Sequence, residues 1–490
     1  MKNSTLGQIR AYWLGCVVCM GGFLFGYDSG IVGGVLTLAS FASDFRYSKA
    51  HKTRVNSLAV GLQQAGAFVA CLVVWPIADR LGRKKTLMLS SAIFMVGAVI
   101  ETINTHSMAA FYVGRVVAGV GLGASSVVVP MFSSEMAPRE IRGRIGSFFQ
   151  MFYTIGIFTS YWVDYAVLQL ISPHSASQWQ IPIALQIIPA GLLGFGCLTL
   201  PESVRWLTKK GRRDEAWTSL QWIRADSSSS TIEEMEEIRT GVEMERHATE
   251  GLTVKELTER QNLSRLGTAA AVFTAQQATG ATAFAYFGPQ YFKLLVNGSA
   301  AKNLLLTAIF GAIKVAACGF FVLFLSERVG RRQVLIWGAV FMAACQISTA
   351  AVVKAKPPPA KVGDGGVTSS GIATVALIYL FVIAYNLSWG PLPWPYVSEI
   401  FPTRIREIGI AVGVSSQWLF NFVFSLTTPY MITNMGWGTF LLWGLFDAVI
   451  AVFTFFFLKE TRGLSLEEIV HNDFEEVRDH KVIDVEDNGK

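Results

Sequence analysis

DRLGRK, residues Asp79 to Lys84, returns later in the chain as ERVGRR, residues Glu327 to Arg332, and each copy lies between two long apolar runs. A second pair of segments follows in the same order. SEMAPREIR, ending at Arg142, matches SEIFPTRIR, ending at Arg406, at the Ser, Glu, Pro, Ile and last Arg positions. Two charged motifs that recur in one order indicate a chain built from two related halves, a plan that recurs among multi-span membrane proteins.

The composition places this duplicated chain in a membrane. Of its 490 residues, 52% are hydrophobic and only 16% are charged, whereas a soluble domain is about 25% charged. A helix that crosses a hydrocarbon core needs roughly 20 apolar residues. Stretches of this kind occur at 11–38, 55–77, 86–103, 108–130, 145–168, 181–200, 266–295, 303–325, 334–353, 371–397, 408–431 and 436–458. We therefore predict an all-α membrane protein with twelve transmembrane helices in two six-helix halves.

Charge divides the chain further. Charged residues are densest over 201–265, which hold 24 of the chain's 76, including an acidic run from Glu233 to Glu237. Charged helical runs of this kind usually face water. We predict an N-terminal half over 11–200, a cytoplasmic helical linker over 201–265, a C-terminal half over 266–458 and a cytoplasmic tail over 459–490.

The loops indicate the orientation. Short cytoplasmic loops carry an excess of Lys and Arg, and their distribution here, with the even number of spans and the charged linker, favours cytoplasmic termini. Asn297, in the sequence NGS, then lies outside and is a glycosylation candidate. No cleavable signal is expected, because the first apolar run continues through Asp28 to Leu38. The net charge of +6 suits a cytoplasmic membrane surface and requires no nucleic acid.

Two basic residues, Arg115 and Lys314, fall deep inside the predicted spans. A charge at the membrane centre costs about 2.5 to 3.5 kcal/mol on insertion scales, so it usually has a partner and a function. Asp28, midway along the first span, is the expected partner of Arg115. An adjacent arginine favours the ionised carboxylate, and an apolar cavity favours the protonated form. A pair that separates and rejoins would bind and release a proton, as in a proton-coupled carrier; the alternative is a static ion pair between two helices.

Amides and indoles form a second polar group within the spans: Gln150, Gln276, Gln277, Asn386, Trp389, Trp394, Gln417 and Trp418. Amides donate and accept hydrogen bonds, and indoles offer flat apolar faces, so together they suit a polyhydroxylated ring. Hydrogen bonds between helices are the alternative for each amide. The sequence contains no His or Cys cluster with metal-ligand spacing, no phosphate-binding loop and no nucleophile beside a base. We expect no metal, no cofactor and no enzyme activity.

The motifs resemble those of the sugar porters of the major facilitator superfamily, from about Tyr12 to Gly463, in the style of fungal members. The matching pieces are GYDSG (26–30), DRLGRK (79–84), GRVVAG (114–119), PESVRWL (201–207), QQATG (276–280), ERVGRR (327–332), WGPLPW (389–394), SEIFPTRIR (398–406) and KETRG (459–463). The resemblance implies alternating access to a central site.

The resemblance also implies roles for individual residues. It makes Asp28 and Arg115 the proton-coupling pair, because facilitative members typically carry Asn at the position of Asp28. It places the central sugar site at Gln150, Gln276, Gln277, Trp394 and Gln417. It further implies an inner gate that latches the halves while the site faces outward: Asp79, Arg83, Glu135, Arg142, Glu202, Arg205, Glu327, Arg331, Glu399 and Arg406.

Three departures from the sugar-porter pattern concern the substrate. Thr282 stands where many members have Asn, Asn386 where animal relatives often have Glu, and Gln417 where Asn is common before Trp. Lys314 adds a cation that would attract a carboxylate, unless it snorkels along its helix or pairs with an acid such as Asp447. We include Thr282, Lys314 and Asn386 among the candidate substrate-binding residues.

The leading hypothesis is a plasma-membrane proton symporter, with the lipid bilayer and a proton as partners, that imports a monosaccharide such as a hexose or pentose. An acidic sugar or polyol acid, such as galacturonate or quinate, is the alternative substrate. Two further hypotheses are a facilitator without proton coupling and a nutrient sensor. Asp28 argues against the facilitator, and the short tail argues against the sensor.

Overall fold

The long apolar runs fold as helices, in which the backbone satisfies its own hydrogen bonds inside hydrocarbon. The computed structural model describes residues 5–103, 106–138, 142–251, 254–325, 329–358, 368–402 and 404–461, without the side chains of residues 49, 142–147 and 254. Within these ranges the ordered elements are helices, and no strand is present. All six cysteines are free.

The first half of the chain supplies one bundle and the linker. Its membrane helices are α1 (Thr5–Val35), α3 (Lys52–Leu81), α4 (Arg83–Thr102), α5 (Met108–Met136), α6 (Arg142–Leu170), α7 (Ser177–Leu185) and α8 (Ile187–Gly196), with the short α2 (Ala39–Asp44) after α1. The linker contains α9 (Val204–Lys209), α10 (Arg213–Arg224), α11 (Ser229–Thr249) and α12 (Val254–Leu257).

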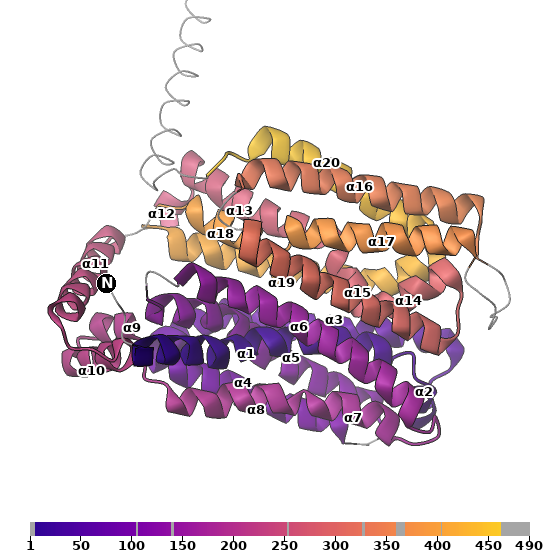
Figure 1. The fold of residues 1–490 in the computed structure, drawn as a ribbon, viewed down its shortest axis with the longest axis horizontal. Coiled ribbons are helices and arrows are strands. Elements are labelled where there is room, and N and C mark those ends of the chain that lie inside the picture. The colour runs from indigo at the N-terminus through magenta and orange to yellow at the C-terminus, as the bar shows by residue number, and fades with distance from the viewer. Residues whose placement is uncertain are drawn as a thin grey trace, which may run out of the picture.

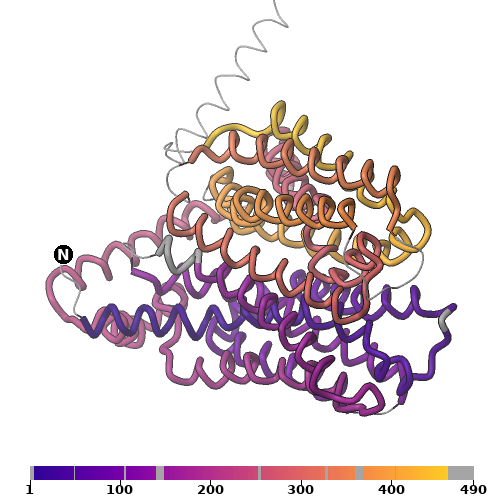
Figure 2. The backbone as a smooth tube through the Cα atoms, turned by 45° about the vertical axis from the view of Figure 1, so that its right-hand side comes forward, coloured from indigo at the N-terminus to yellow at the C-terminus, as the bar shows by residue number. Residues whose placement is uncertain are grey.

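The second half supplies the other bundle. Its helices are α13 (Arg260–Ala278), α14 (Ala281–Val296), α15 (Ala300–Phe320), α16 (Arg331–Ala355), α17 (Ser369–Leu387), α18 (Pro393–Glu399), α19 (Arg406–Met435) and α20 (Gly438–Phe457), with a π-helical turn at Phe321–Leu325 after α15. The two bundles lie side by side, and α9, α10 and α11 extend beyond one end of them (Figure 1). A view turned by 45° shows the same arrangement (Figure 2).

Ten segments of the described chain are long and apolar enough to cross a membrane, and the other two predicted spans correspond to α6 and to the pair α13–α14. Three spans are interrupted, which the sequence did not predict. The span at 266–295 breaks at Gly280, whose φ is +79°, a conformation that glycine adopts at little cost. The span at 371–397 breaks at Ser388 and resumes with Pro393 in the first turn of α18. The span at 181–200 changes helix at Gln186.

The two bundles contact each other at the end opposite the linker. There the Ser57 hydroxyl donates to the Leu426 carbonyl at 2.6 Å, and the Tyr161 hydroxyl donates to the Ala285 carbonyl at 2.7 Å. α1 and α14 approach so closely at Gly33 that a Cβ there would lie 2.0 Å from the Tyr286 carbonyl oxygen. Glycine at position 33 is therefore required for this end to close as the structure shows it.

Replacing Gly33 with alanine should hold this end open. The added methyl meets backbone rather than a flexible side chain, and overpacking of this kind costs about 1 to 3 kcal/mol. We expect substrate uptake to fall by about 5- to 150-fold, with normal amounts of monodisperse protein. Gly241→Ala is the matched control, because no atom lies within 4 Å of a Cβ at that position. Unchanged uptake by the Gly33 variant would show that closure does not depend on this contact.

Candidate functional site

Asp28 and Arg115 form the ion pair that the sequence predicted. Asp28 on α1 and Arg115 on α5 are 1% and 0% exposed, and Arg115 Nη1 lies 2.8 Å from Asp28 Oδ1. The guanidinium also donates from Nε to the Ala59 carbonyl at 2.7 Å and from Nη2 to the Gln63 side chain. These bonds fix the arginine against α3, so that one of its nitrogens faces α1.

A second carboxylate, Glu101 near the end of α4, faces the same nitrogen. Its Oε2 lies 3.6 Å from Arg115 Nη1 and accepts a 3.1 Å hydrogen bond from Gln186 Nε2. Sequence reasoning missed Glu101, because an acid so close to the end of an apolar run is expected to lie at the membrane surface beside a loop. Its signal was the absence of any other acid between residues 86 and 103.

Asp28, Glu101 and Arg115 form one buried cluster whose charge depends on whether a proton is bound. With both carboxylates ionised, the buried cluster has a net charge of −1, and uncompensated buried charge is costly. One proton on either carboxyl group makes the cluster neutral. The geometry can therefore bind one proton at the contact of α1, α4 and α5.

The predicted glutamines of the second half come together at the break between α17 and α18. Gln276 Nε2 donates to the carbonyls of Trp389 and Gly390, at 2.9 and 3.1 Å. Gln417 Nε2 on α19 donates to Gln276 Oε1 at 3.3 Å. Gln277 Oε1 is buried and has no hydrogen-bond partner among the described residues. Amide side chains from α13 and α19 thus lie together at the break between α17 and α18.

Aromatic rings connect the amides of Gln276 and Gln417 to the first half of the chain. The Trp418 ring on α19 lies 5.1 Å from the Phe25 ring on α1, which lies 4.9 Å from the Tyr153 ring on α6. Trp394 packs edge-on against Phe273, with centroids 5.0 Å apart. Helices from both bundles therefore contribute flat apolar faces next to the amides.

Lys314 on α15 points at two aromatic side chains and is 1% exposed. Its Nζ lies 5.2 Å from the centroid of the Tyr153 ring and 5.9 Å from that of Tyr385. Within the described ranges no carboxylate forms an ion pair with it, so the expected alternative of a Lys314–Asp447 pair is wrong. Asp447 faces the α16 side of α20, where Cys345 is a neighbour. The lysine also does not snorkel to the surface, because it is fully buried.

The remaining predicted binding residues differ in their surroundings. Asn386 donates to the Val382 carbonyl of its own helix at 2.8 Å, which leaves its Oδ1 without a partner among the described residues. Thr282, in the first turn of α14, lies beside the Tyr385 hydroxyl. Gln150 is half-buried on α6, one turn before Tyr153. Asn297, which was predicted as a glycosylation candidate and not as a binding residue, follows α14 in a left-handed conformation, between α14 and α15.

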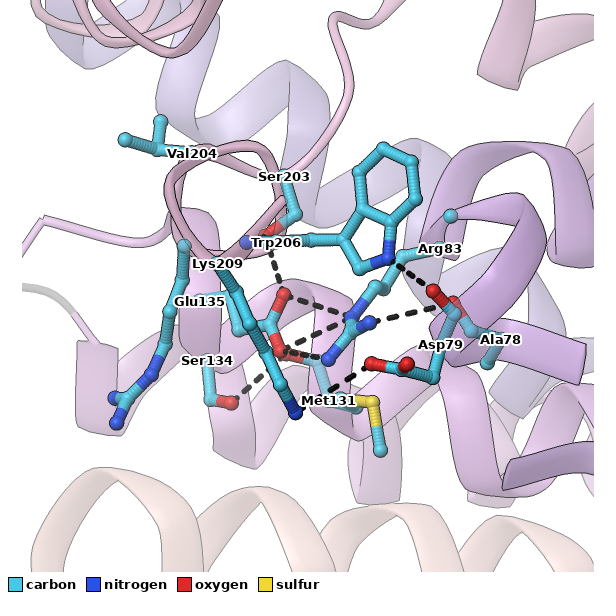
Figure 3. A network of polar contacts seen from close by, with 12 residues as sticks. Ala78, Asp79, Arg83, Met131, Ser134, Glu135, Ser203, Val204, Trp206 and Lys209 are labelled. Atoms are coloured by element: carbon cyan, nitrogen blue, oxygen red, sulfur yellow. Dashed lines mark hydrogen bonds and ion pairs between the residues drawn. The ribbon is translucent and has the colours of Figure 1, made fainter. Parts of the chain in front are cut away.

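The charged repeats build a polar network at the linker end of the first half (Figure 3). Arg83 pairs with Glu135 at 2.9 Å, and Ser203 donates to the same carboxylate. Glu202 Oε1 accepts from the backbone N–H groups of Arg83 and Lys84, at 3.0 and 3.1 Å, in the first turn of α4. A carboxylate at a helix N-terminus satisfies free N–H groups and complements the dipole.

The second half contains the same network. Arg331 pairs with Glu399 at 3.3 Å, and the Thr461 hydroxyl donates to Glu399 at 2.5 Å. Glu460 accepts from the backbone N–H groups of Arg331 and Arg332, at 2.8 and 3.1 Å. Glu460 and Thr461 thus correspond to Glu202 and Ser203 in three dimensions. Sequence reasoning quoted KETRG but missed Glu460 as a network member, because only its Glu matches the PES of the first half.

The other predicted gate residues form contacts on their own side of the molecule. Asp79 pairs with Lys210 at 2.8 Å, Arg205 pairs with Glu245 of α11, and Arg406 donates to the Phe401 carbonyl at 3.2 Å. Glu327 lies outside the described residues, and so does the Arg142 side chain. Among the described residues, the ion pairs of the predicted inner gate join elements within one half or its linker. A latch between the halves therefore stays a prediction for the conformation in which the site faces outward.

Comparisons with known proteins agree with this architecture. The sequence profile of the family described as "Sugar (and other) transporter" matches residues 14–472. The chain is 34% identical over 469 residues to the quinate permease of Emericella nidulans, covering 94% of this chain and 88% of that protein. A probable quinate permease of Aspergillus oryzae is 36% identical over 475 residues, covering 94% and 87%. The inward open conformation of the xylose transporter XylE from E. coli has a TM-score of 0.78 at 24% identity, covering 94% and 99%, which shows a shared fold.

Proposed function

Because the chain belongs to the sugar (and other) transporter family of the major facilitator superfamily, we propose that it is a proton-coupled symporter that imports a polyhydroxylated ring compound bearing a carboxylate. It works by alternating access in the plasma membrane, with both termini in the cytoplasm. The observation that carries the proton coupling is the buried cluster of Asp28, Glu101 and Arg115.

Proton binding changes what holds α1 to α5. When Asp28 is ionised it attracts Arg115 at 2.8 Å, and when it is protonated the attraction weakens. Glu101 remains 3.6 Å from the guanidinium, so the arginine is not left alone in the membrane. α1 is then free to shift while the cluster stays neutral. This is how binding of a proton is linked to rocking of the halves.

Lys314 supports a carboxylate on the substrate. A buried ammonium without an anionic partner is costly, and the rings of Tyr153 and Tyr385 compensate only part of that cost, about 2 kcal/mol for a desolvated cation over aromatic faces. A substrate carboxylate would complete the pair. Relatives named quinate permease share 34 to 36% of their residues with this chain, which supports a polyol acid of the quinate type.

A neutral monosaccharide is the second candidate. The linked amides of Gln276 and Gln417, with the free Oε1 of Gln277, offer donors and acceptors to ring hydroxyls without requiring a charge. The two candidates differ in the net charge that moves with one proton. A neutral sugar moves one positive charge, whose movement through 100 mV releases about 2.3 kcal/mol, whereas a carboxylate moves none.

Accumulation in proteoliposomes of the purified full chain tests the proposal. With quinate, we expect about tenfold accumulation for each unit of imposed pH difference, equivalent to about 1.4 kcal/mol, and none from a membrane potential alone. Accumulation of xylose driven by potential would favour the neutral sugar. Equilibration of both compounds without accumulation under either gradient would contradict proton coupling.

Glu101→Gln is expected to shift the pH dependence and to preserve accumulation. Without the neighbouring carboxylate, protonation of Asp28 leaves Arg115 unpaired, so proton binding becomes less favourable. Half-maximal quinate uptake should move to lower external pH by about one unit or more. Gln186→Leu, which removes only the neutral hydrogen bond to Glu101, should shift it less. A pH profile that superposes on that of the unmodified protein would exclude Glu101 from the proton-binding unit.

A further inference from the structure

Asp164 on α6 is a buried carboxyl group that the proposed coupling does not use. Its side chain is 0% exposed, and neither oxygen has a hydrogen-bond partner among the described residues. The carboxyl group lies directly against α1, because its Oδ2 would be 2.0 Å from a Cβ on Gly34. The sequence pattern does not single out Asp164, since it stands near the end of the apolar run at 145–168.

Among the described residues, no positively charged side chain is paired with Asp164. The titratable groups that face it are Tyr27 of α1 and Tyr161 of its own helix, and both hydroxyls are engaged elsewhere, with the carbonyls of Pro182 and Ala285. α7, which also packs on α1 and α6, has no ionisable side chain between Ser177 and Leu185. An isolated carboxylate in such a site costs several kcal/mol, so the group holds a proton in this conformation.

Asp164 lies next to the contact by which the two bundles close. Tyr161, three residues before it on α6, donates to the Ala285 carbonyl of the other bundle. Gly33, the neighbour of Gly34, abuts the Tyr286 carbonyl, and Gln290 donates to the Gly33 carbonyl at 3.3 Å. When the bundles separate at this end, α14 leaves these residues and water reaches the α1–α6 contact. The carboxyl group would then be solvated and would ionise.

We propose that Asp164 is a second proton-binding site, and that closure of the end opposite the linker requires a proton bound there. The proton enters from the outside solution as the bundles close and returns to it as they open, so this site sets the balance between the two conformations and adds nothing to the proton count of transport. The inference rests on the proposed alternating access and not on proton coupling or on the substrate.

The test measures closure as a function of pH without substrate. Thr53 and Thr433 lie on opposite bundles, with their hydroxyls 3.2 Å apart, so spin labels on cysteines at these positions report the opening of this end. The labels are placed in the full chain with Asp28→Asn, which removes the coupling site, and with the exposed Cys16 changed to serine. We expect the closed-to-open ratio to rise about tenfold for each unit that the pH falls, the slope for uptake of one proton.

Asp164→Asn should make the closed-to-open ratio independent of pH. Asp447→Asn is the matched control, because Asp447 is equally buried and without partners among the described residues but lies on α20, away from this contact; it should keep the slope. A pH-independent ratio with Asp164 intact would overturn the proposal, and so would a slope that survives in the Asp164 variant. If that variant does not fold, infrared spectroscopy of the protein that retains Asp164 takes its place. The closed protein at neutral pH should show the carbonyl band of a protonated carboxyl group, and the absence of that band would equally overturn the proposal.

Discussion

Asp28→Asn should abolish uphill transport and leave exchange intact. Asparagine has nearly the shape of aspartate but binds no proton, so substrate binding and rocking of the halves no longer require one. Accumulation should fall from about tenfold per unit of pH difference to equilibration. The variant should fold, because Glu101 stays within 3.6 Å of Arg115 and the cluster becomes neutral without a proton.

Exchange across the same vesicles separates lost coupling from lost transport. Unlabelled quinate inside the vesicles should still draw in labelled quinate through the Asp28 variant, at a rate within about threefold of the unmodified protein. Glu101→Gln provides the matched comparison, since it makes the same chemical change in the same cluster yet should keep accumulation. A variant that still accumulates quinate under a pH gradient would place the coupling proton elsewhere than on Asp28.

The apolar runs predicted the spans because the apolar length of a segment is a local property of the sequence, and the repeat predicted the two halves for a different reason. DRLGRK shows why the motif is so informative. Gly82 has a φ of +95°, and a Cβ on it would lie 2.3 Å from Glu202 Oε2, so only glycine leaves room for the carboxylate that caps α4. Gly330 leaves the same room for Glu460. The motif is thus a docking site for a distant acid, and it was repeated along with its partner.

The parts of the site that the sequence did not predict depend on long-range contacts. Asp28 could be paired with Arg115 because each is the obvious charge in its own span. Glu101 and Asp164 lie close to the ends of spans, and their burial depends on how other helices, which sequence pattern does not place, cover those ends. The breaks at Gln186 and Ser388 are likewise local departures from helix inside runs that are apolar throughout.

Lys314→Gln should reverse the preference of the transporter for charged over neutral substrates. Removing one partner of a buried charge pair typically costs about 3 to 5 kcal/mol, so we expect kcat/KM for quinate uptake to fall by about 100-fold or more. Uptake of xylose should change by less than about threefold, because a hydroxylated ring has no anion for the lysine to hold, and glutamine keeps most of the stem that packs against Tyr153 and Tyr385.

The ratio of the two substrates, rather than either rate alone, decides the role of Lys314. Loss of packing would lower the uptake of quinate and xylose together, whereas loss of an anion contact lowers only the first. Lys354→Gln is the matched control, because that lysine also lies over an aromatic ring, 4.7 Å from the centroid of Trp437, but is exposed on α16. Equal losses for quinate and xylose in the Lys314 variant would assign the lysine to packing, and the amides of Gln276 and Gln417 would then have to select a neutral ring.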